Sequence, residues 1–205
     1  MALAKDQKMA IAWADYFAGL ASAGLGAISF AIAAAGSMAY YQDKHATEGW
    51  NIDFAVPDPI PSTSEDQGVL HNLTCKQFIA NGNTLVTYSN IIQSASEVRP
   101  DLTSELQSIT QSYFDEIVTA TQTQPMSTVQ QQIDYTISII PLNSSNQEPF
   151  IETLNNLQQA EENQWVSCID SLIIQVDSFA LTVIEKIGLI TSLQILKHSY
   201  ALWGN

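Results

Sequence analysis

The chain has 205 residues, of which 46% are hydrophobic and 14% are charged, and its formal net charge at pH 7 is −14. This apolar content suffices for one sizeable folded domain and excludes a chain that is disordered by composition. The seven Lys and Arg residues are scattered along the chain. Because nucleic-acid binding requires clustered cations, we expect no nucleic-acid partner, and any membrane contact must be hydrophobic. Cys75 and Cys168 fit one disulfide or two small buried thiols equally well.

The first predicted element is an uncharged helix, rich in Ala and Gly, over Tyr16–Gln42. No charged residue or histidine occurs between Asp15 and Asp43, and the stretch exceeds the ~20 apolar residues that cross a bilayer. Interior glycines cost a helix ~1 kcal/mol each relative to Ala, so this helix needs support from protein or lipid. Small residues recur in it every four positions, which on a helix forms a narrow stripe that another backbone can approach closely: Gly19, Ala23, Ala27, Ala31, Ala35 and Ala39.

Three interpretations of this segment compete. Lys5 and Lys8 resemble the basic start of a secretory signal peptide, and Ser37-Met38-Ala39 resembles its cleavage site. Against this, the leader is long and contains Asp6 and Asp15. A membrane-inserting helix and a permanently buried core helix are both apolar on all faces, so these two interpretations stay open. The residues that we expect to mediate membrane contact or assembly are Phe17, Gly19, Leu20, Ala23, Leu25, Ala27, Ile28, Phe30, Ala31, Ile32, Ala35 and Ala39.

A proline-rich, extended connection is expected over residues 43–66, where three prolines alternate with other residues. Tyr40, Tyr41 and Trp50 lie near its start. Aromatic residues at such a place are typical of a membrane interface, and they are equally typical of a loop that packs its rings on a core.

Residues 67–205 are predicted to form amphipathic helices. Apolar residues recur at helical spacing from Gln67 to Val98, and Asn81-Gly82-Asn83 is expected either to interrupt this helix or to kink it. A further helix is expected from Pro100 to Pro125, because proline suits a first helical turn and stops a helix from continuing. The segment Val129–Ile140 fits a helix or a strand, and we favour a helix because no partner strand is evident.

The longest pattern runs from Phe150 to Trp203 without proline. One continuous helix of ~50 residues would be roughly 75 Å long and would imply an elongated bundle or a coiled coil. The alternative is a helical hairpin broken near Gly188. Charged residues such as Asp170 and Asp177 exclude a second membrane span. The predicted fold is therefore all-α: one elongated helical-bundle domain over residues 1–205, with a long C-terminal helix and an apolar N-terminal helix.

No catalytic motif is evident: the sequence contains neither a phosphate-binding glycine loop nor a nucleophile elbow. Asp43, His45 and Glu48 are close in sequence, but their loose spacing favours solvated loop residues over metal ligands. Asp15, at the edge of the apolar stretch, is either an acid whose protonation eases insertion or an exposed carboxylate at a helix end. We expect no enzymatic activity, no metal and no cofactor.

The combination of one apolar helical segment, Phe17–Ala39, with the long pattern Phe150–Trp203 resembles the α-helical pore-forming toxins of the cytolysin A and haemolysin BL type. The resemblance is architectural. It implies a secreted or membrane-associated protein, a toxin or one component of a multi-protein toxin, whose sheltered apolar element contacts a lipid bilayer or partner helices and supports homo- or hetero-oligomers. The alternative is a soluble, non-enzymatic structural or interaction protein whose apolar helix is buried in its own core or in a homo-oligomer interface.

Overall fold

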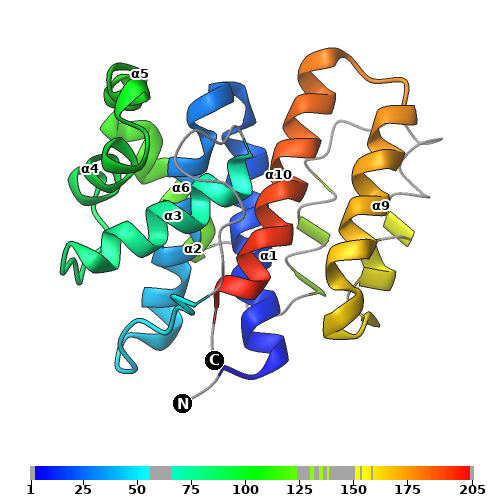
Figure 1. Ribbon diagram of the computed structural model, residues 1–205, viewed down its shortest axis with the longest axis horizontal. Helices are drawn as coiled ribbons and strands as arrows, with labels where there is room; N and C mark the ends of the chain where they lie inside the picture. Colours follow the sequence, from blue (N-terminus) through cyan, green and yellow to red (C-terminus); the bar gives the residue numbers. More distant parts are fainter. Residues whose placement is uncertain are drawn as a thin grey trace.

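The fold, given by a computed structural model, is a bundle of α-helices (Figure 1). The structure describes residues 3–55, 66–123, 130–131, 134–135, 138, 151–152, 154–157 and 159–203. The elements are α1 (Lys5–Ala21), η1 (Ala23–Ile28), α2 (Ser29–His45), α3 (Gln67–Ala80), α4 (Tyr88–Val98), η2 (Pro100–Leu102), α5 (Thr103–Ser108), α6 (Gln111–Thr123), η3 (Glu162–Gln164), α9 (Trp165–Ser178) and α10 (Val183–Leu202). Among the described residues the only β pairing is an isolated bridge between Ile52 and Trp203. The predicted all-α bundle is confirmed, and α10, with 20 residues, is its long C-terminal helix.

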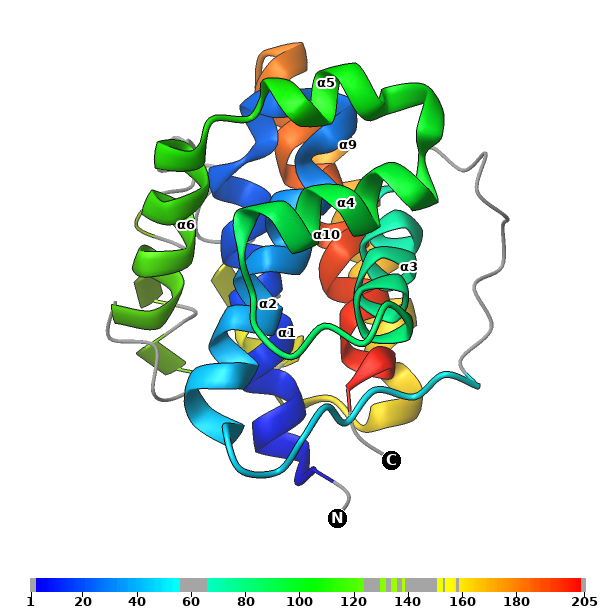
Figure 2. The ribbon, with the colours of Figure 1, turned by 90° about the vertical axis from the view of Figure 1, so that its left-hand side faces the viewer.

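The apolar N-terminal stretch folds as a helical hairpin, α1–η1–α2, in the middle of the bundle (Figures 1 and 2). The prediction of one continuous helix over Tyr16–Gln42 is therefore wrong. The chain turns within η1, where Gly26 adopts a φ of 61°. An L-residue with a side chain rarely adopts this backbone conformation, so glycine permits the turn here. The hairpin form lets the two apolar helices cover one another instead of extending into solvent.

Small residues set the close packing of the two hairpin arms. A Cβ atom added to Gly36 in α2 would lie 2.5 Å from the Cβ of Ala18 in α1 and 3.8 Å from the carbonyl oxygen of Ala14. The arms thus approach until only a hydrogen atom fits between them. The sequence predicts that small residues allow two helices to approach closely, and this contact is of that kind. The two helices are arms of one chain.

We expect Gly36→Ala to lower the free energy of unfolding by about 1–3 kcal/mol, because the new methyl group overpacks the contact between the arms. At a solvent-exposed helical position the same substitution would stabilise the helix, because alanine has a higher helix propensity than glycine. Gly24→Ala is the matched control, since a Cβ added at Gly24 meets no atom within 4 Å. Urea unfolding of both variants checks the prediction; equal stability of the two would contradict the close packing.

Two apolar clusters flank the hairpin. One gathers around α2 and includes side chains from α3, α4 and α6, among them Leu70, Phe78, Ile91 and Phe114. The other lies between α1, α9 and α10 and includes Trp13, Trp165, Leu172 and Leu193. Helix α1 contributes buried residues to both clusters. The hairpin is consequently the shared centre of the core, with the amphipathic helices arranged around it.

The other helix boundaries follow local signals. The interruption predicted at Asn81-Gly82-Asn83 is confirmed between α3 and α4. The helix predicted from Pro100 is divided, because the helical hydrogen bonding stops at Ile109 before α6 begins. Part of the proline-rich connection, residues 56–65, and most of Val129–Ile140 lie outside the described residues.

The long C-terminal pattern is interrupted more than once, so a continuous helix over Phe150–Trp203 is wrong. The chain leaves helical structure at residues 160–161 before η3 and α9, and the break between α9 and α10 falls at residues 179–182. Gly188 is no break, because it is buried inside α10. Thr182 starts α10 with a reciprocal capping box: its hydroxyl accepts from the Glu185 amide at 3.3 Å, and the Glu185 carboxylate accepts from the Thr182 amide at 2.8 Å. This cap satisfies backbone donors at a new helix start without any help from proline or glycine.

Candidate functional site: a closed apolar hairpin and its polar clasps

The structure distributes the predicted membrane or assembly residues over the whole hairpin. Eight of them are buried: Phe17, Gly19, Ile28, Phe30, Ala31, Ile32, Ala35 and Ala39. Leu20, Ala23 and Leu25 are partly buried, and Ala27 is exposed. The four-residue stripe does not lie on one helix, because the turn separates Gly19 from its last three members. In the closed hairpin, Gly19 and Ala23 lie against Ser192 and Gly188 of α10, and Ala27 faces solvent.

One helical run among the described residues is long and apolar enough to cross a membrane. It covers η1 and α2, Ala23–His45, with a mean hydropathy of 1.4, and 72% of its most apolar window is buried inside the protein. Length and composition therefore fit a membrane span, whereas the burial fits a core helix. Both interpretations therefore stay open, because the same segment satisfies the requirements of a membrane span and those of a core helix.

Gln67, the first residue of α3, fastens the turn of the hairpin. Its side-chain oxygen accepts hydrogen bonds from the Phe30 amide and the Ser29 hydroxyl, each at 3.1 Å, and its amide nitrogen donates to the Ala27 carbonyl at 3.3 Å. The first turn of a helix has backbone N–H groups without intrahelical partners. Gln67 supplies a partner for one of them from a distant segment of the chain, so it holds the start of α2 in place.

We expect Gln67→Met to lower the free energy of unfolding by about 1–3 kcal/mol, because a buried amide loses its partner while side-chain volume is kept. Amide hydrogen exchange at Ser29 and Phe30 should accelerate more than exchange elsewhere in α2. Gln93→Met, on an exposed face of α4, is the matched control. Unchanged protection of the two amides would show that Gln67 does not hold the turn.

The far side of the turn is closed by two further hydroxyl groups. Tyr113 of α6 donates to the Ala21 carbonyl at 3.0 Å, and Ser22 donates to the Ala18 carbonyl at 2.7 Å. The Ala21 carbonyl is one of those that the last turn of α1 leaves without a helical partner, whereas the Ala18 carbonyl also accepts from the Ser22 amide at 3.0 Å. Both arms are thus held near the turn by neighbouring helices. Gln67 of α3 binds the α2 arm, and Tyr113 of α6 binds the α1 arm.

A second polar contact that holds the hairpin lies deeper in the core, between Asp15 of α1 and His71 of α3. Both side chains are 0% exposed, and His71 Nε2 lies 2.8 Å from the carboxylate oxygen Oδ1. The other carboxylate oxygen accepts from the hydroxyl of Ser199 in α10 and from Trp203 Nε1 at 3.4 Å. Ser37 of α2 lies 3.3 Å from His71 Nε2. One buried polar cluster therefore joins both hairpin arms to α3 and α10.

The hydrogen bonds around His71 favour its charged form. Nδ1 lies 3.0 Å from the side-chain oxygen of Asn72, whose amide nitrogen donates to the His198 carbonyl at 3.1 Å. Both ring nitrogens therefore face oxygen acceptors, which only an imidazolium satisfies at once. Burial lowers the pKa of His71, but the carboxylate of Asp15 outweighs it, and the pKa lies well above 6.5. The Asp15–His71 pair is an ion pair in the core.

This raised pKa predicts alkaline sensitivity. Because the pKa of His71 is higher in the folded than in the unfolded chain, its contribution to stability is complete below pH 6.5 and is lost as pH rises through the folded-state pKa. We expect the midpoint of urea unfolding to fall on the alkaline side. The fall should be smaller in His71→Leu. An identical alkaline profile for both proteins would contradict the charged assignment.

The composition of this cluster resembles a catalytic triad, but its geometry does not. Ser37, Cys75 and Ser199 surround the Asp–His pair, and all are 0% exposed. His71 Nε2, which would have to accept a nucleophile's proton, already contacts the Asp15 carboxylate. The geometry fits a role in holding helices together. Interpretation of Asp15 as an exposed helix-end carboxylate is wrong, and no sequence signal connected it with His71.

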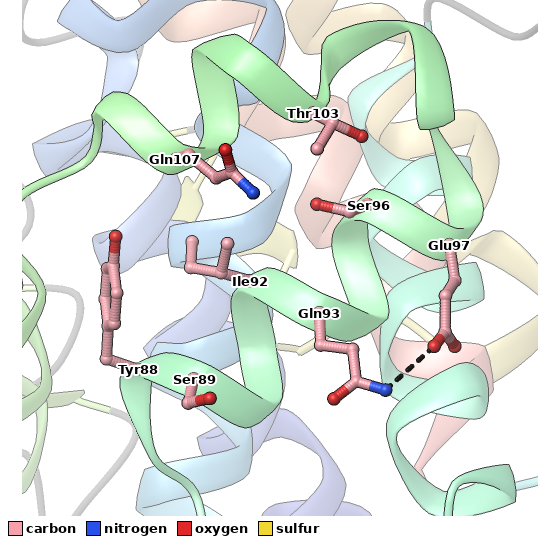
Figure 3. A pocket seen from close by; sticks show the side chains of 8 residues that line it. All are labelled: Tyr88, Ser89, Ile92, Gln93, Ser96, Glu97, Thr103 and Gln107. Atoms are coloured by element: carbon pink, nitrogen blue, oxygen red, sulfur yellow. Dashed lines mark hydrogen bonds between the residues drawn. The ribbon is translucent and has the colours of Figure 1, made fainter.

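A groove of about 460 Å³, lined mostly by residues with a polar group, lies between α4 and α5 (Figure 3). Its side chains are Tyr88, Ser89, Ile92, Gln93, Ser96, Glu97, Thr103 and Gln107. Gln93 donates to Glu97 at 3.0 Å, and this bond, with two from Gln77 and Asn81, lowers the pKa of Glu97. The groove offers hydrogen bonds but no nucleophile paired with a base.

Metal-ligating groups do not gather in the described part of the chain. His45 Nδ1 lies 3.4 Å from a carboxylate oxygen of Glu48, while Asp43 pairs with Lys44 at 2.7 Å. Both cysteines are free thiols, one buried in α3 and one partly buried in α9, so the disulfide alternative is wrong.

Fold and site together define a class of protein: an α-helical bundle built around a buried apolar hairpin. A comparison with known proteins finds no family model, no curated protein and no solved structure that matches the chain. The proposed function consequently rests on the hairpin itself.

Proposed function

We propose that the protein is a membrane-interacting helical-bundle protein, toxin-like or a component of a multi-protein pore-forming toxin, that stores its inserting element as a closed hairpin. One observation carries the proposal. The uncharged stretch Tyr16–Gln42 has the length of a membrane span, yet it is folded back on itself around an exposed glycine turn.

The closed hairpin has the wrong dimensions for a bilayer. Each arm has 17 residues, or about 26 Å of helix, against a hydrocarbon thickness of ~30 Å. The α1 arm would also place Asp15 near the middle of the membrane, where a charge is costly. A straight helix over Tyr16–Gln42 is about 40 Å long and leaves Asp15 at the interface. Insertion therefore requires the turn to straighten.

The turn is suited to such a change. Added Cβ atoms at Gly24 and Gly26 meet nothing within 4 Å, so the backbone can rearrange there without displacing side chains. The side chain of Gln67, which accepts from the Phe30 amide, and that of Tyr113, which donates to the Ala21 carbonyl, hold the turn from outside. Opening breaks those bonds and the Asp15–His71 contact, and transfer of the apolar arms into hydrocarbon offsets the loss of core packing.

Protease protection in vesicles tests the proposal. The full chain is mixed with phosphatidylcholine vesicles and digested, and peptides that survive are identified by mass spectrometry. A protected fragment spanning residues 16–42 is expected. Absence of any such fragment over a range of pH and lipid concentration would contradict insertion.

Ala27 supplies a variant that separates the two states. It is exposed in the closed hairpin but lies near the middle of the straightened helix. Ala27→Lys should leave thermal stability unchanged and cost insertion about 2.5–3.5 kcal/mol, lowering the protected fraction more than tenfold. Ala46→Lys, also exposed but beyond the uncharged stretch, is the matched control and should insert like the wild type.

A permanently closed hairpin is the second candidate, and the buried Asp15–His71 cluster favours it. Removing one partner of a buried ion pair costs about 3–5 kcal/mol, and the cluster ties α1 to α3 and α10. In this case the protein is a soluble structural or interaction protein. Wild type and Ala27→Lys would then both yield no protected fragment.

A further inference from the structure

An exposed apolar surface lies at the end of the bundle where the hairpin turns. We call this set of residues the apolar end: Gly24, Leu25, Gly26, Val183, Ile184 and Ile187. Val183 and Ile184 are 72% and 76% exposed, and Ile187 is 50% exposed. Three large aliphatic side chains are thus exposed together at the start of one helix, and exposed apolar groups that lie together often mark a contact surface.

The hairpin turn and the start of α10 form one continuous surface. A Cβ atom added to Gly188 would lie 3.0 Å from the Cβ of Ala23. A groove of about 460 Å³ runs beside this contact and is lined by Leu20, Gly24 and Ile184, among others. Both views place the hairpin turn and the start of α10 at the same end of the bundle (Figures 1 and 2).

The charges around the apolar end determine which kind of lipid surface it can bind. The turn contains no charged residue, and neither does the stretch 178–184 before Glu185. Lys186, the neighbouring cation, donates to the Asp177 carbonyl at 2.6 Å, and two carboxylates, Glu116 and Glu185, line the groove. With a net charge of −14 for the whole chain, an anionic membrane would repel the protein. An electrically neutral, zwitterionic lipid surface would not.

We infer that the apolar end is the surface by which the closed protein docks on a zwitterionic lipid bilayer. The inference rests on the proposed membrane function and adds the encounter step and its lipid class. A bilayer is favoured over a protein partner because the floor of this surface is the turn of the bilayer-length uncharged stretch itself. Docking here brings that turn to the lipid before it opens.

Vesicle flotation with phosphatidylcholine tests the docking surface, using full-length protein. Ile184→Glu/Ile187→Glu should reduce the fraction recovered with vesicles at least about tenfold, since two exposed aliphatic contacts are lost. Position 184 is in the first helical turn, where a carboxylate suits the helix dipole and the fold is kept. Leu85→Glu is the matched control: Leu85 is 62% exposed, next to Thr84, whose carbonyl accepts from Gln42 at the opposite end of α2.

Two readouts separate failure of the docking surface from failure of insertion. Flotation measures docking, and protected fragment per vesicle-bound molecule measures insertion. Equal flotation of the double variant and the wild type would overturn the docking surface while leaving insertion intact. Wild type that does not float, or that instead dimerises through this surface in sedimentation, would also overturn it. For the double variant we expect a loss of flotation, while the yield of protected fragment per vesicle-bound molecule stays unchanged.

Discussion

His71→Ala is expected to lower the free energy of unfolding by about 3–5 kcal/mol, because it leaves the Asp15 carboxylate in the core without its cation. Both side chains are 0% exposed, so the carboxylate stays in the core, where an unpaired charge is costly. Native domains are typically stable by only ~5–15 kcal/mol, so this variant should be close to unfolding at room temperature. Urea unfolding at pH 6 measures the effect.

A double-mutant cycle identifies the pair as the cause. Asp15→Leu/His71→Leu should be less destabilised than the sum of the two single variants, because no buried charge is left unpaired. The ion pair between His198 and Asp66 is the control: its N–O distance is 3.5 Å and its side chains are 17% and 28% exposed. His198→Ala should cost no more than about 1 kcal/mol. Additive single effects at Asp15 and His71 would contradict a coupled pair.

Covalent closure of the hairpin should abolish insertion. A Cβ atom added to Gly19 would lie 3.6 Å from the Cβ of Ser192, within the ~3.5–4.5 Å that a disulfide requires. Only the flexible end of Ile195, at 2.8 Å, has to move. The oxidised Gly19→Cys/Ser192→Cys protein keeps α1 on α10, so Tyr16–Gln42 cannot straighten into the bilayer.

Reduction provides the internal control for this variant. Oxidised protein should yield no protected fragment, and addition of dithiothreitol should restore the wild-type yield. Gly19→Cys alone, under oxidising conditions, should behave as the wild type does. An oxidised double variant that inserts as well as its reduced form would show that the hairpin does not open. The native thiols of Cys75 and Cys168 are free, so both are replaced by alanine in every protein compared.

Local signals predicted much of the fold. Glycine and proline positions marked the breaks near Gly82 and Pro100, and helical spacing identified α3, α4 and α10. The hairpin was missed because small residues at four-residue spacing are compatible with a straight helix and with two arms that pack on each other. The break before Val183 carries neither glycine nor proline, and only the Thr182 to Glu185 spacing of a capping box signals it.

The site was harder to predict, since its contacts join distant parts of the chain. Asp15 and His71 are separated by 56 positions, and Asp15 and Ser199 by 184. Gln67 gave no signal, because one glutamine at a helix start is ordinary in sequence. The uncharged stretch itself identified the central element of the protein correctly, but composition does not distinguish an arm that stays in the core from one that leaves it.

The most direct test of hairpin opening is the distance between the two outer ends of the hairpin. Spin labels are attached at Asp6→Cys in α1 and Lys44→Cys in α2, both exposed positions, with Cys75 and Cys168 replaced. In water the packed arms should hold the labels within roughly 25 Å, given interhelical distances of ~8–10 Å plus the label arms. In phosphatidylcholine vesicles a straightened helix should separate them to about 57 Å. A distance that stays short in the vesicle-bound protein would contradict the opening of the hairpin.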